Sequence, residues 1–154
     1  MARKKSSSRK SKPSKPSRRS KQPQRRATTA DPLLGPVTGA TSRNLGHVRL
    51  DVGPAGAARV KRLIYPPGFR WSKDMKPVVG TDLCMHAHVG FLVRGEIHIE
   101  YADGCIVEHK APHVMAIEPG HDGWVVGKEP AVVIEIDFEG DTVNRLGMPP
   151  RHQH

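Results

Sequence analysis

The sequence predicts an all-β protein, a sandwich or closed barrel, preceded by a basic tail. From residue 47 onward, short segments with alternating apolar and polar residues follow one another, and turn residues separate them at near-regular spacing. No segment of this part keeps helical periodicity over three turns. The chain has 154 residues, which is enough for one domain with a tail.

The net charge of +10 is concentrated at the amino end. Residues 1–28 contain twelve Lys or Arg and no acidic residue, whereas the rest of the chain has a net charge of −2. Because this segment has almost no apolar residue, we expect it to be disordered. It could bind nucleic acid or another polyanion, or serve only as a solubilising or targeting extension. The candidate nucleic-acid contacts are Arg3, Lys4, Lys5, Arg18, Arg19, Arg25 and Arg26.

The two cysteines do not amount to a disulfide framework, and the amino end lacks the apolar segment of an export signal. No apolar run approaches the length of a membrane span, so no membrane partner is expected. These features favour a cytoplasmic, reducing location.

The elements are expected in the following order. Residues 1–45 form the tail and a linker rich in Pro and Gly, 46–145 form the folded domain, and 146–154 form an unpaired terminal tail. An extended segment begins at Val78-Val79, and most strand boundaries carry Gly beside Arg, Asp or Pro, which is typical of turns. The predicted strands are 47–52, 59–64, 91–93, 96–101, 105–108, 113–117, 124–126 and 131–138.

Side chains that can bind metal gather at two places in the middle of the chain. In a strand, successive side chains point to opposite faces, so Asp82, Cys84, His86 and His88 would share one face. His121 follows a tight Pro-Gly turn further along the chain. A carboxylate, a thiol and imidazoles in one place suit a transition metal.

Two turns in this region resemble the motifs of the cupin superfamily. Arg94-Gly95-Glu96 resembles the hairpin that closes the first cupin motif, and Glu118-Pro119-Gly120-His121 resembles the turn of the second. The interval between them is similar to the family's short inter-motif length, and the resemblance covers residues 59–138. It implies a jelly roll (double-stranded β-helix, the cupin barrel) with a metal site, and a homodimer, since cupins often dimerise.

The family's first motif is G-x5-H-x-H-x3-E-x6-G, and no register supplies its full ligand set. Counting back from Gly95 places the two His positions on Asp82 and Cys84, and the Glu position on His88. Counting from the two histidines of this stretch places the Glu position on Leu92 instead.

A group of small, largely uncharacterised cupins is similar to this chain over residues 68–72, 88–95 and 119–127. In that group a Cys precedes the His of the first block, so the resemblance favours Cys84, His88 and His121 as ligands. That set is soft and points toward zinc, copper or nickel. With Asp82 in place of Cys84, the composition becomes that of a two-His-one-carboxylate iron site.

The neighbouring residues allow structural interpretations as well. His86 could be a further ligand or a packed histidine, Asp82 could line the pocket or cap a turn, and Cys84 could be a core residue. Asp122 could orient His121, and Trp124 could line the pocket or anchor the core.

The remaining histidines and the second cysteine are expected to have no role at the site. His98, His109 and His113 are predicted to lie at the surface, and Cys105 is predicted to be structural. His152 and His154 could bind metal weakly, but terminal histidines are more often incidental.

Two functions stay open at this point. The first is a barrel that binds a divalent transition metal (zinc, iron, nickel or copper) and a small molecule, with an open coordination position for a substrate. The alternative is a non-enzymatic sensor or scaffold for a small ligand, tethered by its tail to nucleic acid or another anionic surface.

Overall fold

The computed structural model describes residues 31–154, so the predicted tail and its candidate nucleic-acid contacts, from Arg3 to Arg26, lie outside the described residues. The described part is mostly β, as predicted, and its helices have only four or five residues. The strands are β1 (Thr41–Leu45), β2 (Val48–Ala55), β3 (Ala58–Tyr65), β4 (His88–Arg94), β5 (Glu96–Tyr101), β6 (Ile106–Lys110), β7 (His113–Ile117), β8 (His121–Val125) and β9 (Ala131–Asp137). The helices are α1 (Trp71–Asp74), α2 (Lys76–Val79) and α3 (Thr142–Leu146).

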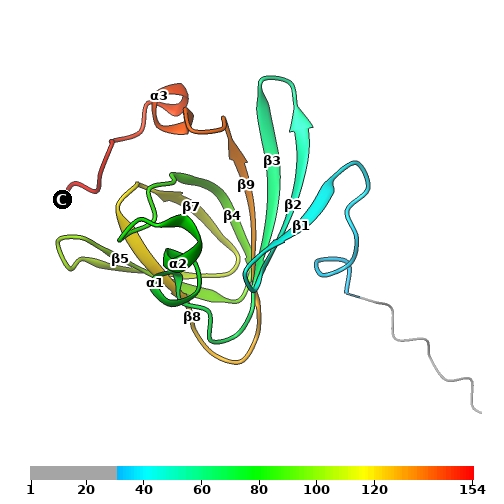
Figure 1. Cartoon of the computed structure of the whole chain (residues 1–154), viewed down its shortest axis with the longest axis horizontal. Coiled ribbons are helices and arrows are strands. Elements are labelled where there is room, and N and C mark those ends of the chain that lie inside the picture. Colours follow the sequence, from blue (N-terminus) through cyan, green and yellow to red (C-terminus); the bar gives the residue numbers. More distant parts are fainter. Residues whose placement is uncertain (1–30) are drawn as a thin grey trace, which may run out of the picture.

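The strands form two antiparallel sheets in the order of a jelly roll. One sheet has the order β1-β2-β3-β9-β4-β7 and the other the order β6-β5-β8. Strand β9 lies between β3 and β4, β7 lies beside β4, and β8 lies beside β5. The chain therefore passes repeatedly from one sheet to the other, and the sheets curve around a common interior (Figure 1).

The interior is apolar and follows from strand alternation. In β5 the side chains of Ile97, Ile99 and Tyr101 are buried, and the residues between them are only partly buried. Leu92 and Met115 face them from the other sheet and are almost fully buried. Each such side chain contributes roughly 1.5–3 kcal/mol when removed from water. The barrel is thus held together by apolar packing.

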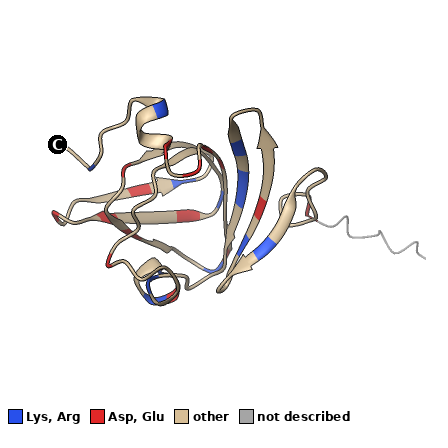
Figure 2. Ribbon diagram, turned by 45° about the horizontal axis from the view of Figure 1, so that its top comes forward, with Lys and Arg blue, Asp and Glu red and all other residues tan. Residues whose placement is uncertain are grey.

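Charged residues are interspersed over the folded part and form no basic face in the view of Figure 2. Some ion pairs are buried. Arg62 of β3 donates to Asp51 Oδ2 of β2 from Nε at 2.9 Å and from Nη2 at 2.6 Å. The same guanidinium donates to the carbonyl oxygens of Leu33 and Gly35, which fixes the start of the described chain against the sheet.

Several boundaries differ from the prediction for local reasons. Val78-Val79 belongs to helix α2, which ends at Gly80 in the left-handed conformation that glycine adopts readily. Strand β1 lies within the segment predicted to be a linker. Its residues are polar and largely exposed, so no alternation of apolar residues indicated a strand there. Within the described residues, no helix is long and apolar enough to cross a membrane.

Candidate metal centre

Residues 82–88 do not form the strand on which the shared face of these side chains depends. Strand β4 begins only at His88, and Thr81 Oγ1 donates a hydrogen bond to Leu83 O at 2.7 Å, a local bond that competes with strand pairing. The shared face predicted for this stretch is therefore lost. Asp82 is 93% exposed and pairs with Lys76 Nζ at 2.9 Å, so it does not face the interior.

Cys84 is held in place by the turn that precedes β8. Its N–H donates to His121 O at 2.7 Å, and its own carbonyl accepts from Gly120 N at 2.8 Å. This isolated bridge brings Cys84 next to His121, while the start of β4 brings in His88. Two segments far apart in sequence thus meet at one point.

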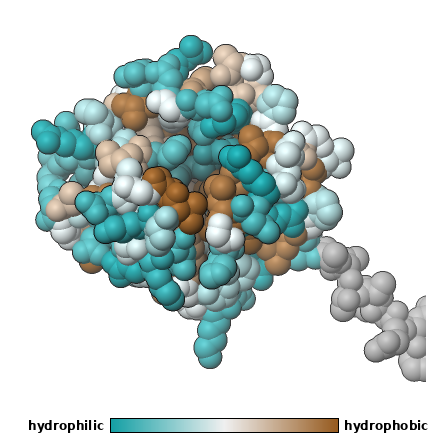
Figure 3. Space-filling model, in the orientation of Figure 1, coloured by the Kyte–Doolittle hydropathy of each residue, from teal (hydrophilic) through white to brown (hydrophobic). Residues whose placement is uncertain are grey.

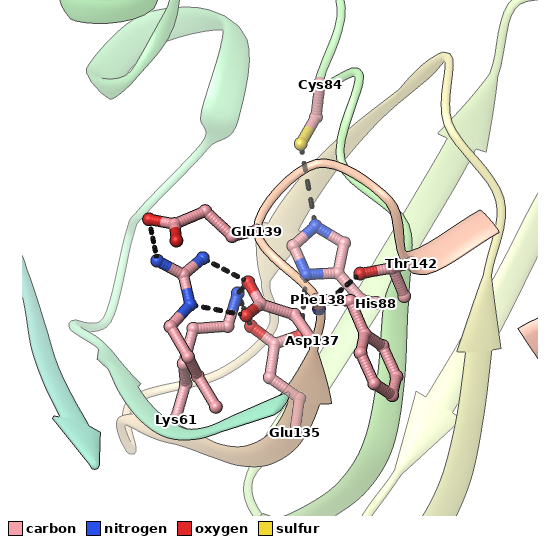
Figure 4. Close-up of polar contacts among 9 residues, drawn as sticks. Lys61, Cys84, His88, Glu135, Asp137, Phe138, Glu139 and Thr142 are labelled. Carbon is pink, nitrogen blue, oxygen red and sulfur yellow. Dashed lines mark hydrogen bonds and ion pairs between the residues drawn. The ribbon is translucent and has the colours of Figure 1, made fainter. Parts of the chain in front are cut away.

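Cys84, His88 and His121 converge with their ligand atoms within 4.8 Å of one another. Cys84 Sγ lies 3.5 Å from His88 Nε2 (Figure 4). Sulfur and nitrogen ligands of tetrahedral zinc, at about 2.3 and 2.0 Å from the ion, stand about 3.5 Å apart. Cys84 and His121 are buried, and His88 is only slightly exposed. The three residues fit a transition metal ion.

Both imidazoles are oriented by hydrogen bonds of Nδ1. His88 Nδ1 lies 2.8 Å from Glu135 Oε2, and His121 Nδ1 lies 2.7 Å from Glu118 O. A donating Nδ1–H leaves Nε2 with a lone pair, which is the form that binds metal. His86 is exposed, with its ring centroid 6.5 Å from that of His88, and it is not in the convergent group.

Glu135 is the functional residue that sequence reasoning missed. It lies inward on β9, and the pairing of β9 with β4 places it opposite Gly90, two residues from His88. A Cβ at Gly90 would lie 2.0 Å from Ile134 O, so only glycine permits this approach. The available signal was a pair of acidic residues, Glu135 and Asp137, at inward positions of an otherwise apolar strand, since a buried carboxylate needs a partner.

Ion pairs continue from Glu135 into the barrel. Lys61 Nζ lies 3.1 Å from Glu135 Oε1 and 2.7 Å from Asp137 Oδ2 (Figure 4). Arg59 donates to both oxygens of Asp137 at 2.7 and 2.9 Å. Burial raises the pKa of Asp137, but these two cations outweigh it and hold the pKa well below its usual range. Burial likewise raises the pKa of Glu135, which His88 and Lys61 hold low.

Without a metal ion, the site favours a thiolate beside an imidazolium. Burial raises the pKa of Cys84, but hydrogen bonds from His121 and His88 outweigh it and lower the pKa to about 5. Burial lowers the pKa of His88, but Glu135 and Cys84 outweigh it and raise the pKa to about 10. The sulfur is thus in its metal-binding form at neutral pH, whereas His88 must release a proton to bind an ion.

The two residues expected around the ligands take different roles. Asp122 accepts hydrogen bonds from Ser72 N and Oγ and from Arg70 Nε, at 2.7–2.9 Å, and so fixes α1 rather than His121. The ring of Trp124 is partly buried, lines the interior cavity and stacks under the Arg70 guanidinium at 4.5 Å.

The surface positions predicted for the other histidines are correct only in part. His113 is exposed, and His98 is partly buried, beside Trp124 and Glu96. His109 is buried, because it takes an inward position on β6, on the same face as Val107.

The three convergent residues line a cavity of about 420 Å³. On the face seen in Figure 3, apolar side chains border a hollow near the centre of the molecule. The lining is mostly apolar and includes Leu50, Leu63, Trp71, Met75, Ile99 and Met115.

No family model and no curated protein matches the sequence. Several solved structures are similar. A cupin 2 conserved barrel domain protein from Salinispora arenicola has a TM-score of 0.49 and 15% identity, over 74% of this chain and 94% of that chain. The cupin domain of Cnp3 from Schizosaccharomyces pombe has a TM-score of 0.45 and 10% identity, over 71% and 76% of the two chains. AerE from Microcystis aeruginosa has a TM-score of 0.48 and 15% identity over 64% of this chain, which spans only 44% of AerE.

At these identities the likeness concerns the fold and names no activity. The two sheets and their strand order are defined by the hydrogen bonds between the strands of this chain itself. Several of the similar structures are cupin or cupin-like proteins, the superfamily that the two turn motifs resemble.

Proposed function

We propose that the chain binds a divalent transition metal ion through Cys84, His88 and His121. The observation that carries the proposal is that three ligand atoms converge while hydrogen bonds hold both Nδ1 atoms. Thiolate and imidazole ligands favour zinc, copper or nickel. The iron alternative is weaker, because the side chain of Asp82 lies in solvent.

The cavity beside these ligands would take a small, largely apolar molecule. Its volume of about 420 Å³ falls in the range of small-molecule sites, and its lining supplies apolar contact. Three protein ligands leave a coordination position open, where a bound ion would polarise the molecule or a water. Trp124 and Met75 would position the apolar body, and Glu135 would hold His88 in its metal-binding tautomer.

The experiment is a titration of chelator-stripped full chain with zinc, nickel, copper and iron. We expect Cys84→Ser, His88→Ala and His121→Ala each to lose one bound ion that the wild-type chain retains. His47→Ala, at a side chain that is 79% exposed, is the matched control, and Asp82→Asn should also leave binding unchanged. Far-UV circular dichroism checks that each variant folds. Unchanged metal content in all three ligand variants would refute the proposal.

A second function uses the same atoms without a metal. Cys84, His88 and Glu135 form a chain of contacts of 3.5 and 2.8 Å, which is the order of nucleophile, base and orienting carboxylate in a thiol enzyme. An ion on Cys84 and His88 would block this chemistry, so the two functions exclude each other. Rapid alkylation of Cys84 by iodoacetamide in chain saturated with zinc would favour the thiol function. Protection by zinc would favour the metal site.

Two partners are proposed: nucleic acid or another polyanion, bound by the basic tail, and a second copy of the chain. The charge segregation of residues 1–28 supports a contact with nucleic acid or another polyanion.

An exposed apolar stripe on the outer face of the larger sheet supports a homodimer. It consists of Val60, Phe91, Val114 and Ile136, of which Val60 pairs with Ile136 and Phe91 with Val114. Phe91→Glu should then reduce the mass measured by light scattering from dimer to monomer.

A further inference from the structure

The end of the described chain folds back onto the β5–β6 turn instead of remaining unpaired. The ring of His152 stacks on Tyr101 with centroids 3.8 Å apart and planes 7° from parallel. His154 Nε2 lies 2.9 Å from Asp103 Oδ2 in the turn itself. Two contacts, two residues apart, thus hold this segment against one hairpin.

These contacts bring a second set of soft ligands together. Cys105, which follows the turn, is a free and partly buried thiol. Its sulfur and one nitrogen from each of His152 and His154 lie within 4.8 Å of one another. One thiol and two imidazoles are the donor types that zinc-like ions prefer, and Asp103 offers a carboxylate beside them.

His152 supplies an independent observation. Its Nδ1 is buried, and among the described residues it finds no hydrogen-bond partner. Glu118 Oε2 lies 3.5 Å away, an ion-pair contact that is too long for a good hydrogen bond. A buried polar nitrogen left in this way is costly and rare in native proteins. The cluster with Cys105 and His154 uses one nitrogen of this ring, so an ion there would hold a side chain that the described residues leave without its full set of partners.

We propose that Cys105, His152 and His154 form a second site for a divalent transition metal ion of the zinc class. Asp103 either completes the ligand set or accepts from His154 and orients its ring. The ion fastens the C-terminal segment to the β5–β6 turn. The site shares no ligand with the one formed by Cys84, His88 and His121, so either can fail without the other.

A series of contacts connects this second site to the first. Tyr101, on which His152 stacks, donates its hydroxyl to Glu118 Oε2 at 2.7 Å. The backbone oxygen of Glu118 accepts from His121 Nδ1. An ion that fixes His152 therefore also fixes the residue that orients one ligand of the first site.

The test measures zinc binding to the full chain carrying His121→Ala, which removes the first site. We expect this chain to keep one zinc ion, and we expect His154→Ala or Cys105→Ser, added to it, to abolish that binding. His113→Ala is the matched control at an exposed histidine. Because His154 is a terminal side chain, 66% exposed, its replacement should not affect folding. The same variant in the wild-type chain should lower the stoichiometry by one ion.

Limited trypsin digestion tests whether zinc holds the C-terminal segment against the β5–β6 turn. Zinc should slow cleavage after Arg151, measured as release of the last three residues by mass spectrometry. In Cys105→Ser this protection should disappear, while cleavage after the exposed Lys128 stays the same with and without zinc. Zinc binding that survives both His154→Ala and Cys105→Ser, or a cleavage rate at Arg151 that zinc does not change, would overturn the proposal.

Discussion

Replacing Glu135 by glutamine tests how the protein holds His88. The amide keeps the shape and an oxygen that can accept from His88 Nδ1, but it removes the buried charge 2.8 Å from that nitrogen. Loss of such an outer partner typically weakens metal binding 10–100-fold, which corresponds to about 1.4–2.7 kcal/mol.

A smaller effect opposes this one. The amide also lowers the pKa of His88, which reduces competition from the proton. The ion carries twice the charge of that proton, so the missing carboxylate costs the ion more, and the net result is weaker binding.

The assay is competition for zinc with a chromophoric chelator at pH 7.5. Thermal unfolding of the metal-free variant checks the fold, which should survive because Lys61 keeps Asp137 as a partner at 2.7 Å. Glu129→Gln is the control, since that carboxylate is 70% exposed. Zinc affinity of Glu135→Gln equal to or above that of the wild-type chain would refute the role assigned to Glu135.

Three further predictions follow from other parts of the structure. Zinc affinity should rise about tenfold per pH unit from pH 7 to 9, because His88, with its pKa near 10, must release a proton, and a flat profile would contradict this. Arg62→Met should lower the free energy of unfolding by about 1.5–3 kcal/mol in urea, because it removes both hydrogen bonds to Oδ2 of the buried Asp51 and leaves only Arg49 and Ser42 on the other oxygen; an unchanged free energy would argue against it. Deleting residues 1–28 should abolish binding to RNA, and the affinity of the full chain should fall steeply with salt; RNA binding by the shortened chain would show that the charges of the tail are not responsible.

The fold could be predicted because its signals are local. Alternating residues and turn glycines mark most strands, and β5 and β7 coincide with their predicted ranges. The position of His121 at the site could be predicted from the tight Pro119-Gly120 turn that precedes it. The predicted shared face of Asp82 to His88 failed because β4 begins only at His88 and Cys84 pairs with His121 in an isolated bridge.

The rest of the site depends on long-range pairing that sequence spacing does not reveal. Glu135 reaches His88 only because β9 enters the larger sheet beside β4, 47 residues away along the chain. The stacking of His152 on Tyr101 depends on the path of the terminal segment after α3. Neither contact leaves a pattern within one element.

The most direct test of the metal centre is X-ray absorption on the zinc-loaded chain carrying Cys105→Ser and His154→Ala, which removes the second cluster. The ligands Cys84, His88 and His121 predict one sulfur at about 2.3 Å and imidazole nitrogens at about 2.0 Å from the ion. A shell of nitrogen and oxygen alone, with no sulfur, would contradict the site.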